Sequence, residues 1–510
     1  MTLNPTFSEK QAMVASAMDM LNKFNSFPSE LAGSGTQFIT SGNADTAERA
    51  HNAAVIATLP LAITNDTAGD SLNDILGTLE KAARLSMDDT SPSYMAYIPS
   101  GGLFHSAVAD LLSSSLNRYV TINEAAPALA AIENSCVFWL CKEIAGYDDA
   151  GGGVLTSGGS LANLIAIHCA RRAAMGNIDL PNATIYVSEQ AHYCVAQAAR
   201  FVGLQPKHIK AIPAGEGTAK MDVDALRAQV SLDISSGLTP IAVCATVGTT
   251  NTGAVDDVVG CRAVCDELSE RLPEGKSIWL HVDAAYGGAF ALSETGKGIV
   301  GDLSVADSVV IDPHKGLFLP YGLGALLVKD KGKLLRANHE DGACMQPPAF
   351  FDGPGSEVTP DLMNLSPELT REFRGLRLWL PLKMIGVKAF REALEEKLEL
   401  TRWAAAKIRS SGVDNLSVVH EPELSVFTFK LAPPGVEGTA LDDLNVRFLN
   451  AIHEKGRSLL SPFRSINGVP GELCVRMAVL SYRTDKEAVD NTVYDVISSA
   501  RELSNEAQCC

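Results

Sequence analysis

Two short apolar segments, each leading to a charged residue, constrain the fold of this chain most. Residues 279–283 (Trp-Leu-His-Val-Asp) are typical of a buried strand that ends at Asp283. Residues 308–311 (Ser-Val-Val-Ile) predict a second buried strand, with Lys315 in the turn that follows. Nearly continuous apolar runs of this length indicate strands of a sheet that is covered on both faces. The chain therefore places a carboxylate and a lysine at strand ends, where α/β sheets bind their ligands.

Strands and helices alternate from about residue 110 to residue 380. Predicted strands cover residues 184–188, 241–246, 278–283, 308–311 and 325–328, and predicted helices cover 161–173 and 257–271. This alternation predicts an α/β domain of three layers. After Pro381 the pattern is helical to about residue 410, and strands near 425–430 and 472–480 precede a terminal helix. The last part of the chain is thus expected to form a smaller α+β domain.

Three regions follow from these patterns. Residues 1–110 are expected to form a helical segment, with helical spacing at 11–24 and a polar loop near 33–43. This segment either packs on a partner subunit or forms a simple capping layer. Residues 111–384 form the large domain and residues 385–510 the small one.

Composition excludes several classes of partner. The 510 residues carry a net charge of −18, which argues against a nucleic-acid surface and against binding to anionic membranes. No apolar run reaches the roughly 18 residues of a membrane-spanning helix. The 11 cysteines include no CxxC pair, so we expect no metal site and a reduced, cytoplasmic protein.

A lysine and a carboxylate at strand ends suit an enzyme that uses pyridoxal phosphate (PLP). The lysine forms a Schiff base with the cofactor aldehyde, and the carboxylate keeps the pyridine nitrogen protonated, so that the ring accepts electrons. Lys315 and Asp283 are the candidates for these roles. The small residues after Asp283, beginning with Ala284 and Ala285, leave room for a flat ring.

Other residues complete a candidate cofactor site. Gly158, Gly159 and Ser160 precede an apolar helix, whose N-terminal N–H groups suit a phosphate. His192 begins a helix after a predicted strand, where an imidazole can stack on the ring and transfer protons. Thr246 ends another strand, where it either contacts the cofactor or is an ordinary strand residue.

In this order, the motifs resemble the group II PLP-dependent amino-acid decarboxylases, which include aromatic-L-amino-acid, glutamate and cysteine-sulfinate decarboxylases. The resemblance runs from about Ser91 to Tyr482 and is most specific at residues 281–286 (His-Val-Asp-Ala-Ala-Tyr) and 312–315 (Asp-Pro-His-Lys). It implies the aspartate-aminotransferase fold (fold type I) and a homodimer with active sites at the interface. It also implies that the substrate is a small molecule, an L-amino acid.

The resemblance also implies roles for individual residues. Lys315 is the Schiff-base lysine, Asp283 the pyridinium partner and His192 the stacking histidine. By the same likeness Ala285 packs on the opposite ring face, and His314 orients the lysine. The resemblance also implies that the phosphate is bound by Gly158, Gly159 and Ser160. It implies that the substrate α-carboxylate is bound by Arg476.

The chain departs from the family pattern at two places. Asp312 stands where asparagine is usual, and no tyrosine occurs between Tyr321 and Tyr482. Family decarboxylases commonly place a tyrosine in the loop after the lysine, where it protonates the substrate carbon after CO2 leaves. Here the matching stretch is 338–346, which leaves His339, Tyr321 or solvent as the acid.

The substrate is expected to be an aromatic or neutral L-amino acid. Tyr97 and Tyr119 either shape an aromatic pocket or belong to an interface core. Residues 123–127 resemble the glutamate decarboxylases more, so an acidic substrate (glutamate, aspartate or cysteine sulfinate) is an alternative. The missing tyrosine leaves a second alternative, oxidative conversion to an aldehyde. A non-catalytic scaffold is a third, remote alternative.

Overall fold

The computed structural model describes residues 8, 11–12, 14–19, 54–61, 70–175, 182–215, 218–338, 360–464 and 472–509. The predicted polar loop at 33–43 and the loop around Met345 lie outside these residues. In the N-terminal region, helix α3 (Leu72–Arg84) is followed by α4 (Phe104–Leu116) and α5 (Pro127–Leu140). The predicted limits of the three regions, at residues 110 and 384, stay predictions.

A seven-stranded sheet forms the centre of the molecule. Its strand order is β1-β7-β6-β5-β4-β2-β3, and only β7 runs antiparallel to its neighbours. The strands are β1 (Gly152–Thr156), β2 (Ala183–Ser188), β3 (Ile209–Ile212), β4 (Thr239–Thr246), β5 (Trp279–Asp283), β6 (Ser308–Ile311) and β7 (Gly324–Val328). The five strands expected from the sequence are all present.

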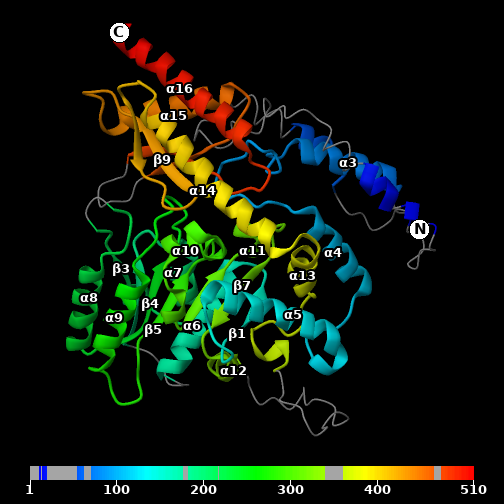
Figure 1. Ribbon diagram of the computed structural model, residues 1–510, viewed down its shortest axis with the longest axis vertical. Helices are drawn as coiled ribbons and strands as arrows, with labels where there is room; N and C mark the ends of the chain where they lie inside the picture. The colour runs from blue at the N-terminus through cyan, green and yellow to red at the C-terminus, as the bar shows by residue number, and fades with distance from the viewer. Residues whose placement is uncertain are drawn as a thin grey trace.

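Helices cover both faces of this sheet, as the doubly apolar strands predict. Successive residues of one strand enter opposite cores: Val309 packs in one and Val310 in the other. One core is completed by α5, α8 (Val223–Ser235) and α9 (Val258–Ser269), the other by α6 (Gly159–Met175), α7 (Tyr193–Phe201) and α12 (Lys331–Asn338). This is the three-layer α/β arrangement, with its helices visible around the green and cyan strands (Figure 1).

A smaller, antiparallel sheet follows in the chain. Its order is β10-β11-β9-β8, with β8 (Leu416–His420), β9 (Val426–Leu431), β10 (Ser461–Arg464) and β11 (Leu473–Ala478). The helices α14 (Val387–Arg409), α15 (Gly438–Glu454) and α16 (Lys486–Cys509) pack with it. Figure 1 shows this α+β unit, in orange and red, beside the large sheet, with α14 running between the two.

The helical region around Pro381 differs from expectation in where it begins and breaks. Helix α13 (Gly375–Ile385) already contains Pro381, and the break falls at Gly386, whose φ is 83°. A proline in a helix cannot donate to the carbonyl four residues earlier. Here that carbonyl, of Arg377, instead accepts a hydrogen bond from the Ser106 hydroxyl at 2.8 Å. A contact from α4 thus satisfies the carbonyl that the proline leaves free.

One buried contact joins the two sheets close to the end of β5. The Tyr286 hydroxyl accepts from the backbone N–H of Ser425 at 2.7 Å and lies 2.8 Å from the Ser425 hydroxyl. Among the residues described, none of the helices is both long and apolar enough to cross a membrane.

Candidate active site

A cavity of about 310 Å³ lies at the ends of β4, β5 and β6 and the start of α6. Nine of the twelve site residues expected from the sequence line it: Gly158, Gly159, Ser160, His192, Thr246, Asp283, Ala285, His314 and Lys315. They come from segments as far apart as residues 158 and 315, and the parallel strands bring them together. Arg476, Tyr97 and Tyr119 do not line the cavity.

Lys315 lies on a one-turn helix, α11 (Pro313–Gly316), directly after β6. Its Nζ is 3.0 Å from Oδ2 of Asp312. Burial lowers the pKa of Lys315, but the charges of Asp312 and Asp283 outweigh burial, so that the pKa is raised. The neighbouring His314 bonds through Nδ1 to the carbonyl of Leu323 at 2.7 Å, which fixes its ring on the wall of the cavity.

Asp283 ends β5 as a buried carboxylate whose two oxygens are both bonded. Oδ1 accepts from the backbone N–H of Ala285 at 3.1 Å, and Oδ2 accepts from the side-chain amide of Asn163 at 3.1 Å. An ionised carboxylate in a protein interior needs such donors. The two hydrogen bonds therefore fix this carboxylate at one end of the cavity.

His192 is the N-cap residue of α7. Its Nδ1 accepts from the backbone N–H of Cys194 at 3.3 Å, so in the neutral ring the proton is on Nε2. Burial lowers the pKa of His192, although Asp283 opposes this effect. Burial has the opposite effect on the pKa of the Cys194 thiol, which it raises to about 12, so that the thiol stays protonated beside the site.

The turn at the start of α6 leaves no room for a side chain at Gly159. A Cβ on Gly159 would lie 2.9 Å from Oδ2 of Asp312 and 3.3 Å from the Cβ of Ala285. Thr156 supports the turn: its hydroxyl donates to the carbonyl of Gly158 at 3.0 Å. The turn thus presents bare backbone and a helix N-terminus to the cavity, as an anion site requires.

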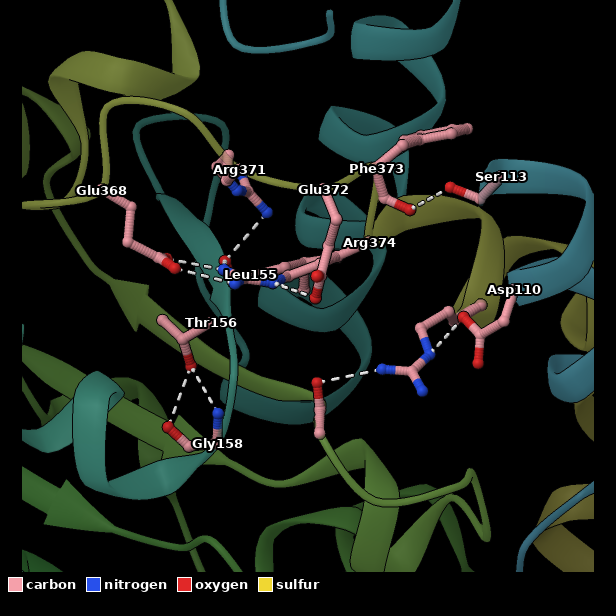
Figure 2. A network of polar contacts seen from close by, with 12 residues as sticks. Asp110, Ser113, Leu155, Thr156, Gly158, Glu368, Arg371, Glu372, Phe373 and Arg374 are labelled. Carbon is pink, nitrogen blue, oxygen red and sulfur yellow. Dashed lines mark hydrogen bonds and ion pairs between the residues drawn. The ribbon is translucent and has the colours of Figure 1, made fainter. Parts of the chain in front are cut away.

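Two arginines hold the strand that leads into this turn (Figure 2). Arg371 and Arg374 donate to the carbonyl of Leu155 at 3.0 and 3.1 Å. Arg374 also pairs with Glu368 through two contacts, at 2.6 and 2.8 Å. Arg371 pairs with Glu133 at 2.5 Å, and both of those side chains are fully buried. Because Leu155 directly precedes Thr156, this network fixes the end of β1, where the turn begins.

Arg476 lies just behind the cavity. Its Nη1 donates to the carbonyl of Thr250, a lining residue, at 2.8 Å, and its Nε donates to the Ser461 hydroxyl at 3.0 Å. The ring of Tyr97 lies 6.0 Å from the guanidinium. Burial lowers the pKa of Arg476 to about 10, so it remains a cation at neutral pH. Tyr119 is 37% exposed, away from the cavity.

Sequence reasoning missed several lining residues. Asn163, Cys194, Thr250 and Tyr286 line the cavity, and so does Asp312, which the sequence marked only as a departure. Asn163 had one available signal, because it is a polar residue one turn into an apolar helix that follows the glycine turn. Its partner Asp283 is 120 residues away, however, and no local pattern gives that distance.

The donor set of the cavity fits PLP. The glycine turn, which a single Cβ would fill, suits the phosphate, and Asp283 suits a pyridinium nitrogen. Lys315 supplies the amine for a Schiff base. Oδ1 of Asp312 is buried without a hydrogen-bond partner among the described residues, so the cavity also holds an unsatisfied acceptor. No cluster of metal-ligating side chains occurs in the described part of the chain.

Comparison with known proteins agrees with this chemistry. Residues 55–432 match the pyridoxal-dependent decarboxylase conserved domain. The aromatic-L-amino-acid decarboxylase of Bacillus atrophaeus is 30% identical over 420 residues, covering 82% of this chain and 83% of that protein. Cysteine sulfinic acid decarboxylase of Homo sapiens is 28% identical over 378 residues, covering 72% and 73%. The structure of Catharanthus roseus tryptophan decarboxylase in complex with L-tryptophan matches with a TM-score of 0.81 at 22% identity, covering 98% of this chain and 99% of that one. The chain therefore belongs to the pyridoxal-dependent decarboxylases, carboxy-lyases that act on amino acids with PLP as their cofactor.

Proposed function

We propose that this enzyme decarboxylates an aromatic or other neutral L-amino acid, releasing CO2 and the corresponding amine. The single observation that carries the proposal is that Lys315, Asp283 and His192 line one cavity beside the glycine turn. When bound there, PLP supplies the aldehyde that takes up the substrate amine and the ring that accepts the electron pair of the broken bond.

In this proposal each side chain has one task. Lys315 would hold the cofactor through its side-chain amine, the group that takes the cofactor back when the product leaves. Asp283 would place a negative charge at the ring nitrogen, and His192 and Ala285 would pack on the two faces of the ring. The N–H groups of Gly158, Gly159 and Ser160 bind the phosphate. His314 orients the turn of Lys315, and Thr246 packs at the ring from the end of β4.

Charge in the cavity favours a neutral substrate side chain. Apart from Lys315, no lysine or arginine is among the described residues that line it. We propose that Arg476 binds the substrate α-carboxylate. Because its Nε and Nη1 already donate to Ser461 and Thr250, the carboxylate would be bound by Nη2. A second carboxylate, as in glutamate or cysteine sulfinate, would then lack a cation. Tyr97, beside Arg476, is placed to contact an aromatic side chain.

We further propose a homodimer with active sites at the subunit interface. Large apolar side chains on α4 are exposed in the single chain, including Phe104, Leu111, Leu112 and Leu116 at 51%, 52%, 44% and 47%. Tyr119, which follows this helix, would then belong to the partner's site. Eight cysteines, all of them buried, are free thiols, which favours a reducing compartment, and we propose the cytoplasm.

One observation favours a second product. Because no tyrosine occurs between Tyr321 and Tyr482, the usual acid of the loop after the lysine is missing. The alternative reaction consumes the amino acid, O2 and water and gives an aldehyde, CO2, ammonia and hydrogen peroxide. A non-catalytic scaffold is disfavoured, because a scaffold needs none of Lys315, Asp283 and His192.

The test is a panel of L-amino acids with the PLP-loaded enzyme, in which CO2, amine, ammonia and peroxide are measured together. The panel contrasts tryptophan, tyrosine and phenylalanine with glutamate, aspartate and cysteine sulfinate. We expect the highest kcat/KM for an aromatic member, with amine as the main product and a smaller amount of peroxide. A preference for an acidic substrate would contradict the charge argument, and equal amounts of CO2 and peroxide would establish the oxidative reaction instead.

A further inference from the structure

Four buried polar side chains form a continuous hydrogen-bonded chain behind Asp283. The amide of Asn163 donates to Asp283 at 3.1 Å, and its Oδ1 lies 2.7 Å from Nε2 of His281. Nδ1 of His281 lies 2.8 Å from the Ser308 hydroxyl, and the indole N–H of Trp279 donates to that same hydroxyl at 2.8 Å. Each of these four side chains is at most 3% exposed, so water does not compete for the contacts.

The sheet builds this chain from the alternation of side chains along β5. Trp279, His281 and Asp283 are two residues apart and therefore point to the same face of the sheet. Ser308, on the neighbouring strand β6, is the register partner of His281. Asn163 comes from α6, which packs on this face. The arrangement thus follows from strand register and not from a flexible loop.

The two ends of the chain fix the direction of every hydrogen bond in it. An ionised carboxylate only accepts hydrogen bonds and an indole N–H only donates them. Burial lowers the pKa of His281 to about 4, with Asp283 opposing, so its ring is neutral and has one donor and one acceptor nitrogen. Since Asn163 turns its amide N–H to Asp283, its oxygen faces a protonated Nε2 of His281. Nδ1 of His281 must then accept from Ser308, whose oxygen accepts from Trp279.

We infer that Asn163, His281 and Ser308 are positioning residues that keep Asp283 ionised and thereby keep the pyridine nitrogen of the bound cofactor protonated. Aligned donors in a low-dielectric interior strengthen one another, and donation to a carboxylate favours its charged form. The inference rests on the proposed function, in which Asp283 faces the ring nitrogen. It adds that Asp283 alone does not suffice: the side chains behind it determine the electronic state of the ring.

The test measures the ring nitrogen directly. The enzyme and its variants are loaded with PLP labelled with ¹⁵N in the ring, and the nitrogen chemical shift is followed by NMR from neutral to mildly alkaline pH. We expect the wild-type shift to stay at the pyridinium position throughout. In Ser308→Ala the acceptor Nδ1 of His281 loses its donor, so the ring and Asn163 can reorient, and the shift should move toward neutral pyridine as the pH rises. His281→Phe should show the same change.

Three further variants make the outcome decisive. Ser308→Thr keeps the hydroxyl and should retain the pyridinium shift, and His453→Phe, at a buried histidine of the small domain, controls for a lost core histidine. If His281→Phe fails to fold, Ser308→Ala decides. The inference would be overturned if Ser308→Ala kept the pyridinium shift while Asp283→Asn lost it. That result would leave the role of Asp283 intact. A pyridinium shift that persists even in Asp283→Asn would overturn the assignment of Asp283 itself.

Discussion

The ammonium nitrogen of Lys315 lies 3.0 Å from a carboxylate oxygen of Asp312, the residue directly after β6. Both groups are on the wall of the cavity. Asparagine, usual here in the family that the sequence resembles, would give the lysine a polar neighbour without a charge. The carboxylate of this chain instead favours the protonated lysine, and the pKa of Lys315 is raised although burial alone would lower it.

This relationship predicts how the pH dependence of cofactor uptake changes in Asp312→Asn. Schiff-base formation requires the neutral amine, and a raised pKa lowers the neutral fraction at a given pH. Removing the Asp312 charge lowers the pKa of Lys315, so the variant should take up PLP faster at neutral pH, by about tenfold for each unit of pKa lost. The rate of appearance of the bound-cofactor absorbance, measured over a series of pH values, reports this.

The control for this experiment is Asp330→Asn, which removes a half-buried aspartate after β7 and should leave the profile unchanged. The profile of Asp312→Asn should be displaced toward lower pH. Superimposed profiles for the wild type and Asp312→Asn would mean that Asp312 does not control the charge of the lysine.

Gly159→Ala tests the turn that is proposed to bind the phosphate. The added Cβ would lie 2.9 Å from Oδ2 of Asp312, which is closer than real Cβ atoms approach a neighbour. Overpacking of this kind costs about 1–3 kcal/mol, so PLP should bind roughly 10-fold to 100-fold more weakly. Equilibrium titration of the apoprotein with PLP measures the change. Gly77→Ala, in α3 with open space around the Cβ, is the control, and equal affinities in both variants would contradict the assignment.

The proposed dimer predicts that a charge on α4 separates the subunits. Leu111 is 52% exposed in the single chain, and a glutamate there would be buried in the interface. The wild type should sediment as a dimer. Leu111→Glu should shift toward the monomer, and its activity should fall in parallel with the loss of dimer. Leu232→Glu, at a position 60% exposed on α8, should do neither. A fully active wild-type monomer would refute the interface site.

The missing loop tyrosine predicts mixed products. Without that phenol, protonation of the substrate carbon is slower, so oxygen intercepts part of the reaction and peroxide should appear alongside a larger amount of amine. Met345→Tyr should raise the ratio of amine to peroxide, because a phenol within hydrogen-bond reach supplies the proton faster than water. Cys344→Tyr is the second position to test, and both residues lie outside the described part of the structure. Met384→Tyr, at an exposed position of α13, is the control. Identical ratios in all variants, with and without oxygen, would show that another acid, with His339 the first candidate, already donates the proton.

The sequence predicted those parts of the fold that have a continuous apolar pattern. The predicted strand at 308–311 agrees with β6 residue for residue, and 184–188 agrees with β2 to within one residue. Strand β1 was missed because its sequence, Gly-Gly-Val-Leu-Thr, has only two apolar residues with side chains. Its position depends on β7 instead: a Cβ on Gly153 would lie 2.0 Å from the carbonyl oxygen of Leu326, so only glycine allows this approach.

The same distinction holds for the site. Lys315 and Asp283 could be predicted because each ends a recognisable strand, and strand ends meet at one edge of the sheet. The hydrogen-bonded chain from Asp283 to Trp279 could not, because it depends on which face of β5 meets α6 and on the register between β5 and β6. Those are properties of the packed molecule and leave no local pattern in the sequence.

The proposed function requires that Lys315 carries the cofactor with which this enzyme removes CO2 from an L-amino acid. The most direct test gives the enzyme an aromatic L-amino acid labelled with ¹³C in its carboxyl group and measures labelled CO2 from the wild type, Lys315→Ala and Lys329→Ala. Lys329 is exposed and bonds to the carbonyl of Ser304, away from the cavity, so its variant should match the wild type. We predict that Lys315→Ala releases almost no labelled CO2 and that borohydride fixes PLP to Lys315 alone in the wild type. Continued CO2 release by Lys315→Ala, with PLP trapped on another lysine, would contradict the account.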